Sequence, residues 1–341
     1  MRQPYTVYMR KLLFVLPLLF VLVGIACQQP PPTAAYRQPT FVEGRYAYVP
    51  SPSGIKVVDV NSPSKPLIVG DLPTAGQVVR TQLAGDYLYA IKIQGWDSAT
   101  GAPVPAGVVI ASLDDPLRPE VVTFLPSAYG PFEMLATETH LLVADWAETR
   151  LYDIANPAAP ALLEILPHKY DGFSQTADGT IYGGWASCYF RSGGCTGGIT
   201  VLDLAQDKST TYEYELGVQD VIVIEPYVYA LGLQFALGRL EDIADLTVNL
   251  TDPNLVNGRV VGRTAETLFT VNGNEFNSYD ITDPSLPQQQ DSILAAPDGT
   301  YFLETSLFKG DYALLVSTYG FHVMNTADPH HMFGIGYVAL D

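Results

Sequence analysis

The chain has 341 residues and a formal charge of −18, with 36 acidic and 18 basic side chains. That length allows a large core, and the negative charge is unfavourable for binding nucleic acid or an anionic lipid surface. The acids are dispersed, which is typical of a solvated surface; a halophilic source or a calcium-rich exterior would also account for them. The 26 Pro, 29 Gly and 21 Tyr favour many short strands joined by tight turns.

The first 26 residues have the features of a secretory signal. They contain three basic side chains and no acid, which leaves a net charge of −21 on the rest of the chain. An apolar run of 15 residues, Leu12–Ala26, follows Met9-Arg10-Lys11 and is too short to span a bilayer comfortably. We therefore expect a signal peptide over residues 1–26 and a polar, proline-rich tether over residues 27–37.

The end of this segment, Val23-Gly24-Ile25-Ala26-Cys27, resembles a bacterial lipobox. Ala26 and Cys27 match, whereas Gly24 departs from the usual Leu or Val, and Gly24-x-Ala26 would also suit ordinary signal peptidase. The resemblance implies a lipid on Cys27 and an extracytoplasmic protein anchored to the cell envelope. Gln28 in place of Asp resembles lipoproteins sent to an outer membrane, if the cell has one.

The other two cysteines, Cys188 and Cys195, lie seven positions apart. The Ser192–Gly194 segment between them lets the chain double back, as a disulfide requires. Such bonds persist where a signal peptide would send the chain, and pairing leaves Cys27 as the odd cysteine. We expect this disulfide; two free thiols, or a soft-metal site that would need more Cys or His nearby, stay open as alternatives.

One sequence element recurs along the chain. At Leu151–Pro160 a short strand ends at Asp153 and leads into a turn closed by two prolines three residues apart. Related copies centre on positions 59, 112, 203, 242, 280 and 325, at spacings of 38 to 53 residues. The Asp accepts backbone hydrogen bonds in the turn, and proline, which cannot donate to a sheet, ends the strand. A repeat of this length with internal strand signals favours a propeller.

We therefore predict an all-β fold over residues 38–341: a seven-bladed β-propeller of four-stranded antiparallel blades. The blades are expected over residues 40–71, 78–125, 132–166, 173–216, 220–250, 259–294 and 301–340. The fifth is the least regular, with its third strand over 239–243, and a degenerate fifth blade would leave six. The ring begins with an inner strand and ends with an outer one, so we expect no exchanged strand to close it.

The first blade carries a family resemblance. Tyr46–Val49, Gly54–Val60, Pro63 and Pro66 resemble the LVIVD-repeat family, β-propeller proteins of bacterial and archaeal surfaces. The likeness covers residues 38–341 and is best in the first, third and sixth blades. Because the family has no general assigned activity, the resemblance implies a fold and a location but no chemistry.

Catalytic and metal-binding patterns are absent from the sequence. It contains no G-x-S-x-G, H-E-x-x-H, Walker or EF-hand pattern, so we expect no catalytic residue, metal or cofactor. His330-His331 is more typical of a solvated turn than of a metal pair, and the repeated aspartates are most simply turn caps. A ring of metal-binding carboxylates is the alternative.

Aromatic residues gather in the connections that share one face of the propeller. These are the loops from the second to the third strand of a blade and from the fourth strand to the next blade. Exposed aromatics around one mouth favour a recognition surface, unless they pack loops over the blades. The candidate binding residues are Trp96, Asp97, Tyr129, Trp146, His168, Trp185, Tyr189, Phe190, Arg191, Phe235 and Tyr319.

These patterns predict a monomeric binding or scaffolding module, anchored through its lipid, that recognises an envelope protein or glycan through this face and binds no nucleic acid. An extracytoplasmic enzyme, such as a polysaccharide lyase or hydrolase with carboxylates at the central mouth, is the alternative, because propellers host both classes.

Overall fold

The computed structural model describes residues 41–42, 45–96, 100–189, 194–214, 217–232, 236–248, 256–294, 302–317 and 320–340. The chain divides into two units, Met1–Ala34 and Ala35–Asp341, and every described residue belongs to the second. The expected signal peptide, Cys27 and the tether therefore lie outside the described residues. Within the described part, no helix is long and apolar enough to cross a membrane.

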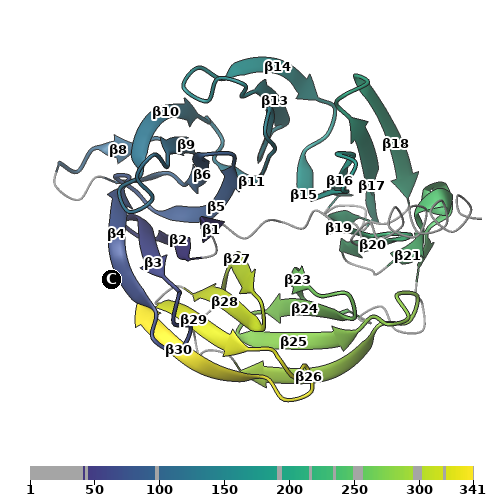
Figure 1. The fold of residues 1–341 in the computed structure, drawn as a ribbon. Coiled ribbons are helices and arrows are strands. Elements are labelled where there is room, and N and C mark those ends of the chain that lie inside the picture. The colour runs from purple at the N-terminus through teal and green to yellow at the C-terminus, as the bar shows by residue number, and fades with distance from the viewer. Residues whose placement is uncertain are drawn as a thin grey trace, which may run out of the picture. The chain divides into compact units, whose positions relative to one another are not determined.

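The unit Ala35–Asp341 is a ring of seven four-stranded antiparallel sheets, which confirms the predicted propeller (Figure 1). Given from the inner strand outward, blades 1 to 3 are β1 (Phe41–Val42), β2 (Tyr46–Ser51), β3 (Gly54–Asp59) and β4 (Leu67–Pro73); β5 (Val78–Ala84), β6 (Tyr87–Lys92), β9 (Gly107–Ser112) and β10 (Glu120–Pro126); and β11 (Pro131–Ala136), β12 (His140–Asp145), β13 (Thr149–Asp153) and β14 (Ala161–Leu166).

Blades 4 to 7 follow the same order. They are β15 (Tyr170–Gln175), β16 (Ile181–Tyr189), β17 (Gly194–Asp203) and β18 (Lys208–Tyr214); β19 (Val218–Ile224), β20 (Tyr227–Gly232), β21 (Ala236–Arg239) and β22 (Thr247–Val248); β23 (Arg259–Arg263), β24 (Thr267–Asn272), β25 (Glu275–Asp280) and β26 (Gln288–Leu294); and β27 (Phe302–Lys309), β28 (Tyr312–Ser317), β29 (Gly320–Asn325) and β30 (Phe333–Ala339).

Each blade uses strands that are consecutive within its own segment, so no strand is exchanged, as predicted. The ring closes by side-chain packing instead. Ala47 and Val58 of blade 1 share a fully buried cluster with Leu314, Phe321 and Val323 of blade 7. An open ring would expose the apolar faces of its first and last blades to water, and this packing buries them.

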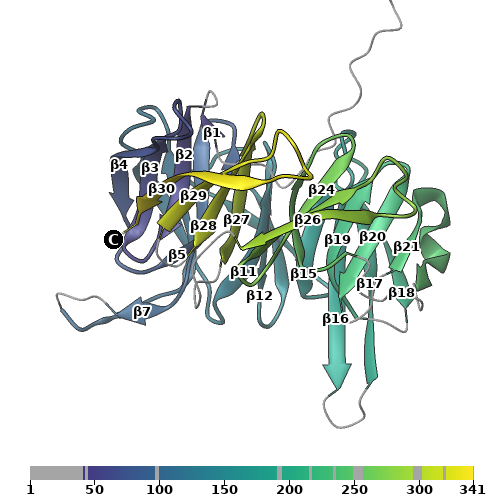
Figure 2. The same cartoon turned by 90° about the horizontal axis from the view of Figure 1, so that it is seen from below.

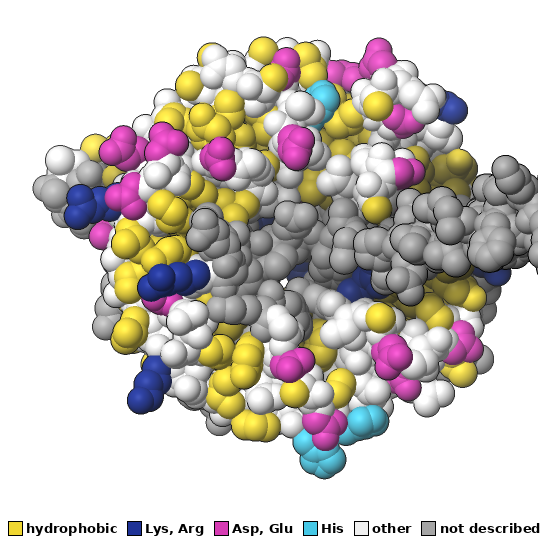
Figure 3. All heavy atoms as spheres, viewed as in Figure 1, with side chains coloured by type: hydrophobic (Ala, Val, Ile, Leu, Met, Phe, Trp, Pro, Cys, Tyr) yellow, Lys and Arg dark blue, Asp and Glu magenta, His cyan; other side chains and the backbone are white. Residues whose placement is uncertain are grey.

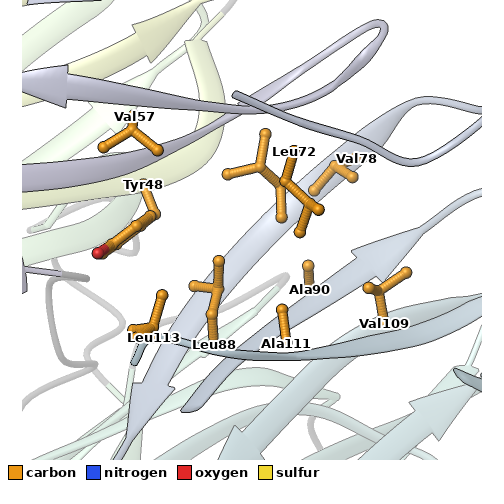
Figure 4. Packing of buried hydrophobic residues seen from close by; sticks show 10 residues of the cluster. Tyr48, Val57, Leu72, Val78, Leu88, Ala90, Val109, Ala111 and Leu113 are labelled. Carbon is orange, nitrogen blue, oxygen red and sulfur yellow. The ribbon is translucent and has the colours of Figure 1, made fainter. Parts of the chain in front are cut away.

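The core lies between neighbouring blades. Figure 4 shows one such cluster, in which Tyr48, Val57 and Leu72 of blade 1 face Leu88 and Val109 of blade 2. These side chains are at most 7% exposed. Period-two alternation puts one set of strand residues toward each neighbouring blade, which is why the strands read as almost continuous apolar runs.

The repeated turns are Asx turns, as predicted. The Oδ1 atoms of Asp59, Asp153, Asp280 and Asn325 each accept a hydrogen bond from the backbone N–H two residues later, at 2.8 to 3.0 Å. The second proline of the turn stands directly before the outer strand in blades 1, 2, 3 and 6. The turn therefore satisfies its own backbone groups and fixes where the outer strand begins.

The same turns also join the blades, which the repeat pattern does not predict. The carbonyl of the turn's first proline accepts a hydrogen bond from the preceding blade: Tyr48 Oη donates to Pro116 O at 3.0 Å, Tyr229 Oη to Pro284 O at 2.6 Å, and Ser278 Oγ to Pro329 O at 2.6 Å. The backbone also approaches closely here, because a Cβ at Gly70 of blade 1 would lie 2.2 Å from the Leu117 carbonyl oxygen of blade 2. Only glycine fits at that position.

Register shifts recur at fixed places. The inner strands β5, β11, β15 and β19 each skip their second residue in pairing, and β23 skips its third. The outer strands β4, β10, β14, β26 and β30 each skip their third. Such bulges re-aim the side chains that follow them and protect sheet edges from pairing with other chains.

Blade 5 departs from the prediction. The third strand expected over Arg239–Ile243 ends at Arg239, and Leu240–Asp245 forms a 3-10 helix, η1. The Asp242 copy of the repeat is therefore wrong, because this aspartate lies inside the helix and not at a strand end. The segment lacks the two prolines that end the strand in regular copies, so nothing there blocks helical turns.

Candidate functional site

Two insertions extend from one side of the ring, where the second-to-third-strand loops lie (Figure 2). In blade 2, β7 (Gly95–Trp96) pairs with β8 (Pro103–Val104) in a short hairpin. In blade 4, β16 and β17 continue past the ring as a long arm. The two predicted long connections are thus strand-built arms on the face that also carries the fourth-strand-to-next-blade loops.

An aromatic shelf lies on this face between blades 2 and 4. It consists of Tyr129, Phe132, Trp146, His168, Lys169 and Trp185. Trp146 is 69% exposed and Tyr129 is 60% exposed, although both are large amphipathic rings. Large exposed rings that share one face are typical of recognition surfaces.

The loop that presents Trp146 is held by a buried carboxylate. Asp145 is 1% exposed and accepts hydrogen bonds from the second and third backbone N–H groups that follow it, at 2.8 and 3.0 Å. It also accepts from Ser127 Oγ at 2.9 Å and from the Arg150 guanidinium at 3.2 Å. Because Ser127 belongs to the loop that carries Tyr129, Asp145 fixes both exposed rings to one anchor.

Lys169 links the shelf to the next blade. Its Nζ lies 5.0 Å from the centroid of the Phe132 ring and 5.2 Å from that of Trp146, and the two rings are 5.1 Å apart. The same ammonium pairs with the Asp171 carboxylate at 2.8 Å. Burial raises the pKa of Asp171, and the contact with Lys169 opposes that shift. The cation–π contact with Lys169 helps to fix the orientation of the Trp146 ring.

Trp185 and His168 differ from their expected exposure. Trp185 is 8% exposed, and its ring stacks on His168 at 4.0 Å with an interplanar angle of 3°. Burial lowers the pKa of His168, so the neutral imidazole is favoured in the stack. At this end of the shelf the aromatics pack the loop against blade 4, which is the packing interpretation that the sequence left open.

A hollow of about 570 Å³ lies beside the exposed rings, between blades 2 and 3. Its walls include Ile93, Gln94 and Arg80 of blade 2 and Tyr129, Phe132 and Trp146 of the shelf. The volume falls within the usual range of small-molecule sites. The mixture of aromatic walls with a few polar groups is also usual for such sites.

A second hollow, of about 820 Å³, lies where the turns between the first and second strands of blades 2 to 4 meet. Its lining includes Glu138, His140, Gln175 and Asp178. Asp178 is committed to its own turn, since its Oδ1 accepts from Thr176 Oγ1 at 2.7 Å and from Thr180 N at 3.0 Å. Although larger, this hollow has no anchored, exposed aromatic among its described residues, so the shelf is the stronger candidate.

The face opposite the two arms is the one that Figure 3 shows. Among the described residues on this face, Asp and Glu side chains are spread around the ring and alternate with hydrophobic and other side chains (Figure 3). A dispersed arrangement of this kind is typical of a solvated surface, as the sequence predicts for the acids, and forms no concentrated site for a cation.

An ion-paired cluster joins the inner strands of three blades. Glu133 on β11 contacts the guanidinium of Arg80 on β5, and its Oε2 accepts from Arg259 Nη2 on β23 at 2.9 Å. The Glu133 side chain is 3% exposed. These contacts connect the inner strands of blades 2, 3 and 6, so this carboxylate braces the ring.

The sequence contains two candidate metal sites, the His330-His331 pair and the repeated aspartates. Within the described ranges, no group of three or more His, Cys, Asp and Glu side chains could hold a metal ion. His331 and Asp328 form an exposed pair, with His331 Nδ1 3.2 Å from Asp328 Oδ2. Asp328 Oδ1 in turn accepts from the backbone N–H of His330 at 3.0 Å, so this pair belongs to the last repeat turn.

The remaining candidate residues are more widely spread. Trp96 is 73% exposed on the β7–β8 hairpin and is not among the residues that line the hollow of about 570 Å³. Asp97, Phe190, Arg191, Phe235 and Tyr319 lie outside the described residues, and only the backbone of Tyr189 is described. Cys188 and Cys195 are direct partners in the antiparallel β16–β17 register. Their side chains are not among those described, so the disulfide stays a prediction.

Sequence reasoning missed three residues of the shelf and its anchor: Phe132, Asp145 and Lys169. Asp145 reads in the sequence as the end of a strand, although Asp-Trp at the start of a short loop could have marked it as an anchor for an exposed ring. No local signal marks Lys169, because it meets Trp146 only when blades 3 and 4 pack together. Phe132 meets Trp146 within blade 3, through the pairing of β11 with β12.

Comparison with known proteins supports the fold. The family model described as LVIVD repeat matches residues 38–74, which is blade 1. No curated protein matches the chain. A periplasmic gluconolactonase of Pseudomonas aeruginosa has a similar structure, with a TM-score of 0.57 and 12% identity over 86% of this chain and 98% of that one.

Two further solved structures are similar. Hsv2 of Kluyveromyces lactis has a TM-score of 0.52 and 11% identity over 87% of this chain and 95% of its own. PorZ, a surface component of the type-IX secretion system of Porphyromonas gingivalis, has a TM-score of 0.53 and 12% identity over 88% of this chain and 37% of its own. Identities this low show a common fold alone. The chain thus carries an LVIVD repeat and folds as a seven-bladed β-propeller.

Proposed function

We propose that the protein is a binding module of the cell envelope that holds its ligand against the aromatic shelf. The observation that carries the proposal is Trp146, which is 69% exposed on a loop fixed by the buried Asp145 carboxylate. A ring exposed by loop disorder would need no such anchor. Preorganising an exposed aromatic lowers the entropy lost when a ligand binds it.

The neighbourhood of Trp146 supports the same function. The hollow of about 570 Å³ opens beside it, and Tyr129 stands on the loop that shares the Asp145 anchor. Binding surfaces commonly concentrate their affinity in a few such aromatic anchors. The catalytic alternative has less support, because Glu133 is occupied by two arginines that brace the ring.

The proposed location rests on the sequence. The apolar run before Cys27 favours export, and the lipobox-like end favours a lipid on this cysteine. Mass spectrometry of the mature N-terminus should find acylated Cys27; an intact Met1 would contradict the anchor.

The proposed disulfide would rigidify the blade 4 arm. Direct pairing of Cys188 with Cys195 in the antiparallel register is compatible with the Cα separation of a disulfide. Thiol titration of unfolded, unreduced residues 35–341 should detect no thiol and, after reduction, two. Two thiols before reduction would rule the bridge out.

The binding role is tested by sedimentation with isolated cell envelopes. The unit Ala35–Asp341 is suitable, because it contains all seven blades and every core cluster but not Cys27. We expect Trp146→Ala and Tyr129→Ala to reduce the sedimented fraction at least tenfold with little change in melting temperature. Phe333→Ala is the matched control, since Phe333 is 55% exposed on the rim strand β30. Equal sedimentation of all four proteins would contradict a role for the shelf.

A further inference from the structure

The ligand class can be inferred from the groups that already surround Trp146. The Lys169 ammonium lies 5.0 and 5.2 Å from the Phe132 and Trp146 ring centroids, within the distance of a cation–π contact. The Lys169 ammonium therefore already serves as the cation for this pair of rings. A second cation would meet repulsion from Lys169 and a weakened attraction from the rings, so an ammonium or methyl-lysine ligand is disfavoured.

An acidic ligand is disfavoured for a different reason. Arg80 lines the hollow and contacts Glu133. Lys169, which contacts the rings of the hollow wall, pairs with Asp171 at 2.8 Å, so both cations are matched by carboxylates. Residues beyond the first 26 carry a net charge of −21, which repels polyanions at long range. A neutral ligand avoids both penalties.

The shape of the site narrows the class further. Trp146 and Tyr129 present flat rings that are 69% and 60% exposed on anchored loops, with the hollow beside them. A pyranose ring offers a flat apolar patch of C–H groups with hydroxyls at its edge. The C–H patch stacks on an aromatic ring, while the hydroxyls need polar partners, which Gln94 on the wall of the hollow can supply.

Resting on the proposed function, we propose that the shelf binds a neutral glycan and that one pyranose ring stacks on Trp146. Tyr129 forms the second wall, and the sugar hydroxyls face the polar lining of the hollow. Lys169 is a positioning residue: it holds Trp146 from the side of blade 4 and does not contact the sugar. Asp145 is also a positioning residue, because its hydrogen bonds hold the loop that carries Trp146.

The test uses immobilised hexasaccharides with the unit Ala35–Asp341. The neutral probes are hexasaccharides of glucose and of N-acetylglucosamine; a galacturonic acid hexasaccharide and a trimethyl-lysine peptide represent the acidic and cationic classes. We expect retention on at least one neutral probe, at least tenfold weaker for Trp146→Ala, within threefold of wild type for Trp146→Phe and unchanged for Phe333→Ala. Trp146→Phe keeps a ring to stack on, so it separates stacking from folding.

Retention only on the acidic or cationic probe, or on none, would overturn the neutral-glycan assignment. The envelope sedimentation assay then separates the two proposals. If Trp146→Ala still abolishes sedimentation, the shelf binds another class of ligand and the proposed function stands. If sedimentation is unchanged as well, both proposals fail.

Discussion

Two contacts between neighbouring blades, one between blades 1 and 2 and one between blades 4 and 5, share a hydrogen-bond pattern but differ in sequence. In the first, the Tyr48 hydroxyl donates to the carbonyl of Pro116 in a regular proline turn. In the second, the Tyr214 hydroxyl donates to the carbonyl of Ile243 in the 3-10 helix η1. Both joints give a tyrosine of one blade a carbonyl of the next, but only the first carries the repeat signature.

The contrast between these two contacts indicates which part of a blade the repeat specifies. The outer strands β4 and β10 follow proline turns and skip their third residue in pairing, whereas β18 follows a turn without proline and pairs without a skip. The inner strands β15 and β19 of the irregular blades nevertheless carry the same skip as β5 and β11. The repeat thus specifies the outer half of a blade, while packing around the ring specifies the inner half.

A substitution at Gly70, where blades 1 and 2 meet, should destabilise the protein more than any other change considered below. Its missing Cβ would lie 2.2 Å from the Leu117 carbonyl oxygen, so Gly70→Val should force blades 1 and 2 apart. We expect a loss of about 3 kcal/mol of unfolding free energy, by analogy with overpacked cores. Urea denaturation followed by fluorescence measures the change.

Gly95→Ala is the control for this substitution. A Cβ added at Gly95 would meet no atom within 4 Å, and the residue lies on the β7–β8 hairpin outside the ring. This change should alter the unfolding free energy by less than about 0.5 kcal/mol, which is usual for surface changes. An equal effect at both glycines would show that the joint at Gly70 is not tight.

The next effect compares the two tyrosine donors. Tyr48→Phe leaves the part-buried carbonyl of Pro116 without its donor, at a side chain that is 0% exposed, and should cost about 1 to 3 kcal/mol. Tyr214→Phe should cost about 1 kcal/mol, because Tyr214 is only partly buried. A larger loss at Tyr214 would mean that the 3-10 helix bears more of the ring's stability than the proline turn does.

The sequence predicts the features that depend on local chemistry. Asp153 followed by Pro157 and Pro160 predicts a strand, an Asx turn and a new strand within one short segment, and the structure has all three. Seven such segments then predict the blade count by arithmetic, even though Asp242 was a false copy. The turn chemistry needs no knowledge of the rest of the fold.

The features that were missed depend on distant residues. Tyr48 and Pro116 are 68 positions apart, and Arg80 and Glu133 are 53 apart, so neither contact leaves a periodic signal. The shelf contains one residue predictable from local sequence and one that depends on distant packing. The loop position of Trp146 is enough to predict its exposure, but the burial of Trp185 by His168 depends on how blades 3 and 4 pack.

The smallest expected effect is a pH dependence in the regular turns. The hydrogen bonds from Thr282 to Asp280, 2.8 Å from the backbone N–H and 2.7 Å from Oγ1, lower the pKa of the Asp280 carboxyl. A carboxyl whose folded pKa lies below its unfolded value of about 3.9 stabilises the fold at higher pH, and this contribution is lost as the pH falls through the folded pKa.

Asp280→Asn keeps the Oδ1 acceptor but cannot titrate. The difference in melting temperature between wild type and variant should therefore be constant from pH 7 to pH 5 and shift against the wild type below about pH 4. Because Asp280 is exposed, the shift should be the smallest of the three effects, and a difference that stays constant down to pH 2 would mean that the turn does not depend on its charge.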